Sequence, residues 1–353
     1  MTMFLAIREI RHNKLRYGLI IGMIALIGYL IFMLMGLMLG LANENTAAIK
    51  SWDTQTVYLN KNANENFSQS LVSKSQIGQL GSHEALVGTT PVVMKKMTGH
   101  ASKQSIQFMG LSKKQYLYQK KLELVAGRKP RNNNEIILDE SLKDKGYHIG
   151  NTVKLNSQGK SLKVVGFVKN AKLNISPLAI GSLSTWQQLK GTNGQYIASG
   201  IFSDQKTSHH HPKLAKYSVH EFIQKLPGYS AQNTTFEFMI GFLMIISLIV
   251  IAVFLYILTM QKLPEYAVLR AQGIPVSTLT GATFAQAMLL MIIGVVISLI
   301  VTLITTLLIP QAVPMLISWP VTILVGISLI VLGAIGALLP VHIITKINPL
   351  DAI

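Results

Sequence analysis

The sequence of 353 residues contains no cysteine and few charged residues. The absence of cysteine excludes a disulfide scaffold and a thiolate metal site. Charged residues make up 13% of the chain, against about 25% in soluble domains. Among the charged residues the acidic ones are in the minority: the chain has 15 Asp and Glu and 32 Lys and Arg, which gives a net charge of +17. The chain is instead 50% hydrophobic, which excludes disorder and an ordinary nucleic-acid-binding protein and indicates a membrane protein.

Long uncharged runs are consistent with this interpretation. A transmembrane helix needs about 20 apolar residues, and four runs are long enough: Gly18–Leu41, Phe238–Met260, Ala282–Ile309 and Val321–Ile344. Only Pro340 and His342, near its end, interrupt the last run. Core helices of a soluble protein are the alternative, but a chain of this size could not bury four such runs. We therefore expect an α-helical membrane protein with four transmembrane helices, one before and three after a large domain.

Basic residues near the ends of these runs predict the orientation. They occur in three segments that we expect in the cytoplasm: the N-terminal segment 1–17, the loop 261–281 and the tail 345–353. The loop 310–320 carries no charge and is expected outside, because basic residues mark the cytoplasmic side. The first run is too long for a signal peptide and is interpreted as a retained anchor. Both termini are thus predicted to be cytoplasmic, in a multi-pass protein of the cell membrane.

The segment 42–235 is predicted to form a large extracellular domain. It holds 25 Lys and Arg against 11 Asp and Glu, so it carries +14 of the net charge; long loops are translocated largely regardless of charge. Alternating or β-branched runs predict strands, at 54–59, 86–94, 105–109, 135–138, 152–155 and 161–168. Helical spacing is found at 70–80, 113–124 and 219–226, and polar loops are expected at 60–68 and 205–216. These patterns predict an α+β domain.

Motifs of enzymes are incomplete. Gly159-Lys160-Ser161 resembles the end of a nucleotide-binding loop, but Lys154 occupies the position where that loop needs glycine. A hairpin turn is the favoured interpretation. His83 and His220 each precede Glu, yet neither is followed by the second histidine of a zinc-protease helix. His209–His211 is a candidate metal or haem-iron site, but its polar loop favours incidental surface histidines. No catalytic site is predicted, and no intrinsic cofactor.

Glycines in the first run predict close helix packing. Gly18 and Gly22 form one G-x-x-x-G pair, and Gly36 and Gly40 form a second. Such pairs let helix backbones approach closely in lipid. The partner is either one of the chain's own spans or a second copy of the chain. We favour a second copy, because four spans make a small transport unit.

Glu44 follows the first run at its outer boundary. On a continuing helix it shares one stripe with Met33, in the series i, i+4, i+7, i+11. Carboxylate and thioether groups at this depth are candidate ligands for the iron of an amphipathic molecule such as haem. Tyr29, Met23 and Met35 line the same helix. From the residues alone, a solvated carboxylate and packing methionines are the simpler interpretation.

The loop after the second run is predicted to form a short helix. Pro264 stands near its start, Glu265 lies in its first turn, and Gly273 ends it. A capped helix that projects from a membrane bundle suits docking into a groove of a partner protein. A simple interfacial turn is the alternative.

These residues carry a family resemblance. Glu265–Gly273 resembles the E-x-[GA]-x-L-[KR]-A-x-G coupling motif of macrolide-exporter-type (MacB/FtsX-like) ABC transporter permeases. The C-terminal Ile347–Ile353 is similar to the closing pattern of that family, and Gly127–Pro130 with Glu135–Leu155 resembles its external core domain. The resemblance implies that a separate ATPase is contacted by Pro264, Glu265, Leu269, Arg270 and Gly273.

A narrower resemblance is found near the N-terminus. Leu5–Ile10, Lys14–Tyr17 and Gly36–Asn45 are similar to haem exporter permeases of Gram-positive bacteria. This implies a homodimer with two ATPase copies, haem as the transported ligand near the outer boundary, and a haem-binding role for Glu44. Movement of the coupling helices would squeeze the substrate outward. Antimicrobial peptide, drug or lipid cargo is the alternative, as is regulation of a cell-wall hydrolase.

Overall fold

The computed structural model describes residues 13–97, 102–156, 159, 161–206, 211–310 and 313–345. The chain divides into two compact units. We call Met1–Gly40 with Asn233–Ile353 the helical unit, and Leu41–Gln232 the β-rich unit. Each unit is described by itself.

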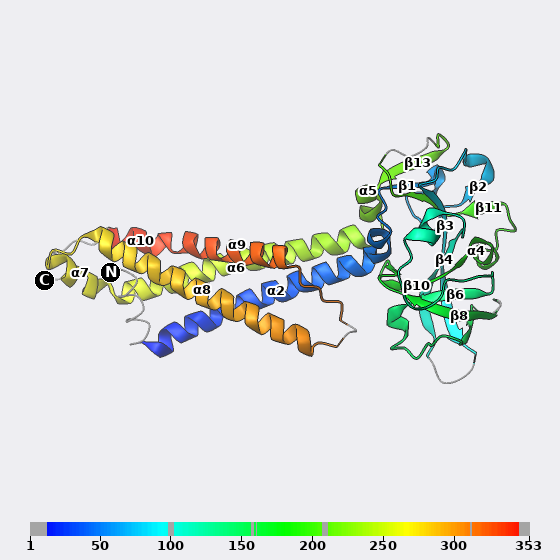
Figure 1. Ribbon diagram of the computed structural model, residues 1–353. Coiled ribbons are helices and arrows are strands. Elements are labelled where there is room, and N and C mark those ends of the chain that lie inside the picture. The colour runs from blue at the N-terminus through cyan, green and yellow to red at the C-terminus, as the bar shows by residue number, and fades with distance from the viewer. Residues whose placement is uncertain are drawn as a thin grey trace. The chain divides into compact units, whose positions relative to one another are not determined.

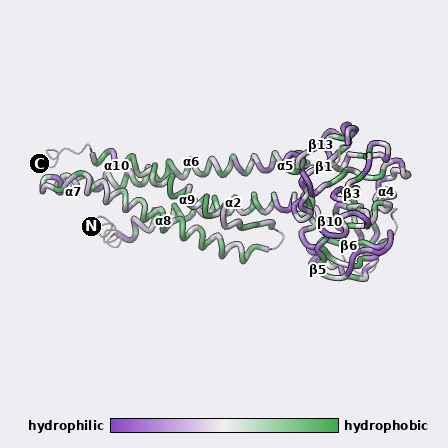
Figure 2. Tube along the Cα trace, turned by 45° about the horizontal axis from the view of Figure 1, so that its top comes forward, coloured by the Kyte–Doolittle hydropathy of each residue, from purple (hydrophilic) through white to green (hydrophobic). Residues whose placement is uncertain are grey.

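The helical unit consists of helices, most of them long (Figure 1). Its helices are α2 (Lys14–Ser51, which continues into the β-rich unit), α6 (Tyr229–Gln261), α7 (Leu263–Ala271), α8 (Val276–Leu308), α9 (Trp319–Gly336) and α10 (Leu338–Thr345). In the part of the chain that the structure describes, four segments are long and apolar enough to cross a membrane: Lys14–Ser51, Tyr229–Gln261, Val276–Leu308 and Trp319–Thr345. Figure 2 shows hydrophobic residues along these helices. The predicted fold of four spans, one before and three after the large domain, is confirmed.

Side chains from different helices form the core of the helical unit. Ile20 and Ile24 of α2 cluster with Leu255 of α6 and Leu290 of α8, all of them buried. The last span breaks between α9 and α10 at Ala337. The cause lies three residues later, where Pro340 has no N–H to donate to the carbonyl of Gly336.

The β-rich unit is a mixed sheet with short helices. Its strands are β1 (Thr56–Asn60), β2 (Val72–Ser73), β3 (Glu84–Lys96), β4 (Gln104–Leu111), β5 (Leu124–Gly127), β6 (Glu135–Asp139), β7 (Thr152–Leu155), β8 (Ser161–Val168), β9 (Lys172–Leu173), β10 (Ser176–Ser182), β11 (Tyr196–Ala198), β12 (Gly200–Ser203) and β13 (Leu214–Ser218). Its helices are α3 (Tyr116–Lys120), α4 (Leu183–Lys190) and α5 (Val219–Gln224), and its 3-10 turns are η1 (Lys61–Ala63), η2 (Lys74–Gln76) and η3 (Glu140–Leu142). The main sheet has the order β13-β1-β12-β3-β4-β10-β6-β8-β5.

Strand β7 closes part of this sheet into a ring. It pairs with both β3 and β8, so the path β3-β4-β10-β6-β8-β7 returns to β3. Apolar side chains of these strands, among them Phe108 and Val164, fill the interior. Trp186 of α4 packs against the ring, and its indole N–H donates to the carbonyl of Thr89 over 3.0 Å. Gly88 leaves room for this indole, because a Cβ there would lie 2.4 Å from it.

A second cluster of buried side chains runs along the sheet, with members in strands from β1 to β8. Trp52, just beyond α2, clusters there with Phe202 of β12 and Phe222 of α5. Their rings contact one another, with centroids 6.1 Å apart for Trp52 and Phe202 and 5.6 Å apart for Phe202 and Phe222. The last turns of α2 are therefore fixed within the β-rich unit, and they carry Glu44.

The predicted strands all occur, as β1, β3, β4, β6, β7 and β8. The antiparallel pairing of β7 with β8 confirms the hairpin predicted around residue 159, although Lys160 lies outside the described residues. The predicted helix at 219–226 is α5, and the one at 113–124 is reduced to the short α3. An α+β domain is confirmed.

The helix predicted at 70–80 is wrong. This segment forms β2 and η2 instead. Val72 is buried and pairs with Ala198, while the side-chain oxygen of Gln76 accepts the N–H of Ser73 over 2.9 Å. Polar side chains that bond to nearby backbone compete with helix formation. The loop predicted at 205–216 is also partly wrong, because β13 begins at Leu214 and pairs with β1.

Candidate functional site

Glu44 lies near the end of α2, in the β-rich unit, and is held by a salt bridge. The Lys172 ammonium donates to both oxygens of its carboxylate, at 2.7 Å each. The two side chains are 25% exposed for Lys172 and 21% for Glu44. Glu44 is therefore neither freely solvated nor sealed in a core. Sequence reasoning missed Lys172, which stands 128 residues away in the chain.

The other candidate ligands on α2 belong to the helical unit and face different ways. Met35 packs within the cluster that contains Ile31 and Phe32, which is the core of the bundle. Met23, Tyr29 and Met33 are half-buried. Tyr29 and Met33 have the helical spacing of Leu26, which is 58% exposed, and of Leu30, which is 43% exposed. Met35 thus fits the packing role, whereas Tyr29 and Met33 lie toward the uncovered face of α2.

The two glycine pairs of α2 have different surroundings. Among the described residues, a Cβ added at Gly18 or Gly22 would meet nothing within 4 Å. At Gly40 a Cβ would lie 2.1 Å from the carbonyl oxygen of Pro314, and at Gly36 it would lie 2.8 Å from Met315. The N–H of Leu316 also donates to the carbonyl of Gly36 over 3.1 Å. The second pair therefore packs against the chain's own loop between α8 and α9, while the first pair is uncovered.

Helix α7 carries the residues of the predicted coupling motif. Pro264 and Glu265 are exposed in its first turn. Leu269 packs with the buried Ala267 and with residues of α8 and α10, and Arg270 is half-buried. Sequence reasoning missed Val268, which is 49% exposed and lies one turn after Pro264 and Glu265. An exposed apolar side chain beside a carboxylate makes this face suited to a protein partner.

The ends of α7 are fixed by backbone and side-chain contacts. Gly273 has a φ of +89°, and its N–H donates to the carbonyl of Arg270 over 2.9 Å, as expected for a glycine that ends a helix.

At the N-terminal end of α7 the Lys262 ammonium lies 5.6 Å from the centroid of the Tyr17 ring. Burial lowers the pKa of Lys262 to about 8. The Tyr266 hydroxyl lies 3.1 Å from that of Thr283 on α8. These contacts join α7 to the long helices.

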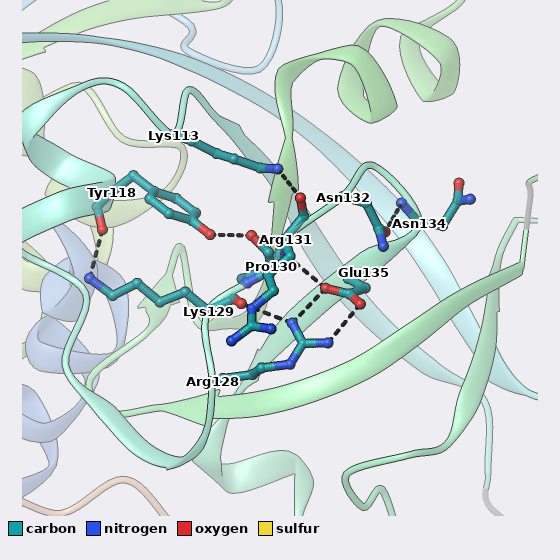
Figure 3. A network of polar contacts seen from close by, with 9 residues as sticks. All are labelled: Lys113, Tyr118, Arg128, Lys129, Pro130, Arg131, Asn132, Asn134 and Glu135. Atoms are coloured by element: carbon teal, nitrogen blue, oxygen red, sulfur yellow. Dashed lines mark hydrogen bonds and ion pairs between the residues drawn. The ribbon is translucent and has the colours of Figure 1, made fainter.

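The segment that resembles the external core domain of the family forms a polar network (Figure 3). The two terminal nitrogens of Arg128 each donate to one oxygen of the buried Glu135 carboxylate, at 2.7 Å. The backbone N–H of Arg131 donates to the same carboxylate. The Arg128 guanidinium lowers the pKa of Glu135 to about 2. Lys129 donates to the carbonyl of Tyr118, and burial lowers its pKa. Arg128, Lys129 and Glu135 all bond to partners within the fold, so this network is structural.

The histidine run at 209–211 is described only in part. Within the described ranges no group of three or more His, Cys, Asp or Glu residues gathers in a way that could hold a metal ion. His209 and His210 lie outside the described residues. The prediction of an incidental surface residue is wrong for His211, which is buried with its Nε2 3.2 Å from the Glu84 carboxylate and its ring against Tyr58. An acidic partner distant in sequence makes this burial favourable.

Comparison with known families decides the assignment. The model of the MacB-like periplasmic core domain matches residues 17–202, which is more than half of the chain. The model of the FtsX-like permease C-terminal region matches residues 237–349. The chain belongs to the MacB/FtsX-like permease family. The predicted resemblance is thereby confirmed, and the protein is an ABC permease with a large extracellular domain.

Relatives similar to this permease over its whole length come from staphylococci. It is 27% identical over 353 residues to a protein of Staphylococcus haemolyticus strain JCSC1435. It is 26% identical over 352 residues to a protein of Staphylococcus epidermidis strain ATCC 12228. Each alignment covers 99% of this chain and 99% of the relative. The names of both relatives assign them to a hemin transport system, as the permease protein HrtB.

Solved structures of external domains are also similar to this permease. The periplasmic region of MacB from Actinobacillus actinomycetemcomitans is 15% identical, with a TM-score of 0.35, over 47% of this chain and 88% of that one. The extracellular domain of the ABC-type transporter YknZ from Gram-positive bacteria is 15% identical, with a TM-score of 0.31, over 44% of this chain and 83% of that one.

Proposed function

We propose that this permease is the membrane subunit of an ABC exporter that extrudes haem from the membrane and so protects the cell from excess haem. The observation that carries the proposal is similarity over 99% of the chain to relatives whose names assign them to hemin transport. Haem is the transported substrate in this proposal, not a resident cofactor.

The chemistry of α2 supports haem as the cargo. Haem combines an iron ion, an apolar ring and carboxylates. The Glu44 carboxylate, a thioether and a tyrosine oxygen are of the donor types that bind iron in proteins. Tyr29 and Met33 lie toward the uncovered face of α2, as does the half-buried Met23 by its spacing from Leu26. Met35, which packs in the bundle core, contributes least.

The exposed face of α7 supports a separate ATPase as the energy source. In the proposal each permease copy binds one ATPase through Pro264, Glu265 and the adjacent Val268, on the cytoplasmic side together with both termini. Closure of the ATPases on ATP moves α7. Because α7 is joined to Tyr17 of α2 through Lys262, and directly follows α6, the movement reaches both helices.

A homodimer in the lipid bilayer completes the exporter. The uncovered pair of Gly18 and Gly22 supports contact with a second copy, because both positions leave room for a helix backbone. Movement of α2 and α6 in the two copies would compress the haem site and expel its cargo outward. No alternating-access pore is required.

Haem absorption tests the proposal. Purified permease in lipid nanodiscs is titrated with hemin, and the Soret band is compared between wild type and Glu44→Ala. We expect wild type to shift the band at micromolar hemin and Glu44→Ala to bind about tenfold more weakly, which corresponds to one charged contact. Asp53→Ala, at an exposed carboxylate that pairs with Lys121, is the matched control. A wild-type protein that leaves the hemin spectrum unchanged would favour peptide, drug or lipid cargo, or a regulator of a cell-wall hydrolase.

A further inference from the structure

The partner of Glu44 is itself positioned by the fold. Lys172 lies in β9, which forms a tight hairpin with β10 through the pairs Leu173 with Ser176 and Lys172 with Pro177. Leu173 is buried in the core of the β-rich unit. Just before the lysine, the N–H of Ala171 donates to the buried Asp139 carboxylate over 3.0 Å. The backbone of Lys172 is therefore fixed, and its ammonium is presented at a defined place.

The tip of the same hairpin is fastened to α2. The N–H of Asn174 donates to the carbonyl of Asn45 over 3.1 Å, beside Glu44. Asn174 and Ile175 both have positive φ angles, of 53° and 66°. This conformation is common for Asn but strained for a β-branched residue. Ile175 is also 48% exposed. The hairpin thus displays an apolar side chain close in sequence to an ammonium that is paired but accessible.

We propose that Lys172 is a subsite for a carboxylate of the substrate, and that substrate binding exchanges the partner of Glu44. This inference rests on the proposed haem export. A haem propionate takes the place of the Glu44 carboxylate on the Lys172 ammonium, and the released Glu44 becomes available to the ferric iron. The number of ion pairs is conserved, because each carboxylate exchanges one cation for another. Ile175 contacts the apolar ring.

The exchange would select for a ligand that carries both a carboxylate and a metal ion. A carboxylic acid without a metal would capture Lys172 but leave Glu44 without a cation. A metal complex without a carboxylate would capture Glu44 but leave Lys172 without an anion. Partly buried charges that lose their partner carry a free-energy cost. Only a ligand that offers both groups restores both pairs, so the salt bridge discriminates against incomplete ligands.

Three related ligands distinguish the carboxylate contact of Lys172 from the iron contact of Glu44. Hemin offers iron and carboxylates, protoporphyrin IX offers carboxylates without iron, and hemin dimethyl ester offers iron without carboxylates. Full-length permease in nanodiscs is titrated with each by absorption or fluorescence. The variants are Lys172→Met, which removes the charge at similar length, and Lys172→Arg, which keeps it. Lys121→Met, which removes another lysine that pairs with a carboxylate in the same unit, is the matched control.

We expect wild type to bind hemin about tenfold or more tightly than the dimethyl ester, which corresponds to one charge-assisted contact. Lys172→Met should abolish this preference in two ways. It should weaken the binding of hemin and protoporphyrin IX, and it should strengthen the binding of the ester, because Glu44 is released. Lys172→Arg and Lys121→Met should retain the preference of wild type.

Two negative results can be told apart. If wild type binds none of the three ligands, the proposed haem export itself is wrong. If wild type binds hemin and Lys172→Met keeps the same preference for hemin over the ester, haem export stands and the carboxylate subsite is overturned. Loss of all binding in Lys172→Met, with an unfolding temperature equal to that of wild type, would also overturn the exchange, because a released Glu44 should still bind the ester.

Discussion

The salt bridge between Arg128 and Glu135 makes the stability of the β-rich unit depend on pH. Arg128 lowers the pKa of Glu135 to about 2, whereas an unfolded chain has a glutamate pKa near 4.3. The pair therefore stabilises the folded state fully above about pH 4.5, and this contribution is lost as the pH falls toward 2.

We expect Glu135→Gln to lower the unfolding temperature at pH 7, and the difference from wild type to shrink as the pH is lowered from 5 toward 2. Tryptophan fluorescence during thermal unfolding measures this, since Trp52 and Trp186 are both buried in the unit. Asp53→Asn removes a carboxylate that is 68% exposed and should have little effect. A difference that stays constant with pH would contradict the assignment.

The candidate site could be predicted from the sequence only in part. The position of Glu44 just after an uncharged run is visible in the sequence, as is the helical spacing that links it to Met33. Lys172 is not visible, because the contact depends on a hairpin that returns to α2 after 128 residues. The same holds for His211 and Glu84, which are 127 residues apart. Polar pairs that the tertiary fold creates have no local signal.

At the scale of elements, the two glycine pairs of α2 should respond differently to the same substitution. Gly40→Leu places a side chain against the backbone of Pro314, which leaves little room to adjust. Overpacking of this kind costs about 1–3 kcal/mol. Gly22→Leu points into open space within the described part of one copy. If the first pair contacts a second copy, this variant should weaken the dimer and leave the folding of the single copy intact.

Two measurements on purified protein separate the effects. Scanning fluorimetry should show a lower unfolding temperature for Gly40→Leu, and light scattering should show a lower dimer fraction for Gly22→Leu. Gly241→Leu, at another uncovered glycine on α6, is the control for added bulk on a helix. A Gly22→Leu protein that remains as dimeric as wild type would argue against α2 as the contact between copies.

Helices and strands with a strong local sequence pattern could be predicted, whereas those with a weak pattern were missed. The four apolar segments and the strands with regular alternation, such as β7, were evident from spacing alone. Strand β10 was missed because it contains Pro177, which disfavours strands, and β12 because Gly200–Ser203 is too short to show a period. The helix expected at 70–80 failed because Ser73 and Gln76 bond to each other instead. Local hydrogen bonds decided the outcome there.

At the scale of the whole molecule, the absence of cysteine makes the orientation easy to test. Gln272 and Lys103 are both exposed, one beside α7 and the other in the β-rich unit. Either can be changed to cysteine without any competing thiol. We expect a membrane-impermeant maleimide to label Lys103→Cys on intact cells and to label Gln272→Cys only after lysis. Cysteine-free wild type gives the background. Labelling of Gln272→Cys on intact cells would reverse the predicted orientation.

Pairing of β1 with strands from the far end of the domain has a consequence for biogenesis. Thr56 pairs with Ser203 of β12 and with Ser218 of β13, yet it follows directly on the first membrane helix. Synthesis proceeds at about 5–20 residues per second, so roughly 7 to 30 s separate the appearance of β1 from that of its partners. During that interval β1 is an unpaired edge in the extracellular space, where it can pair with other chains. Newly made copies of this permease therefore pass through an interval in which β1 is open to pairing between chains.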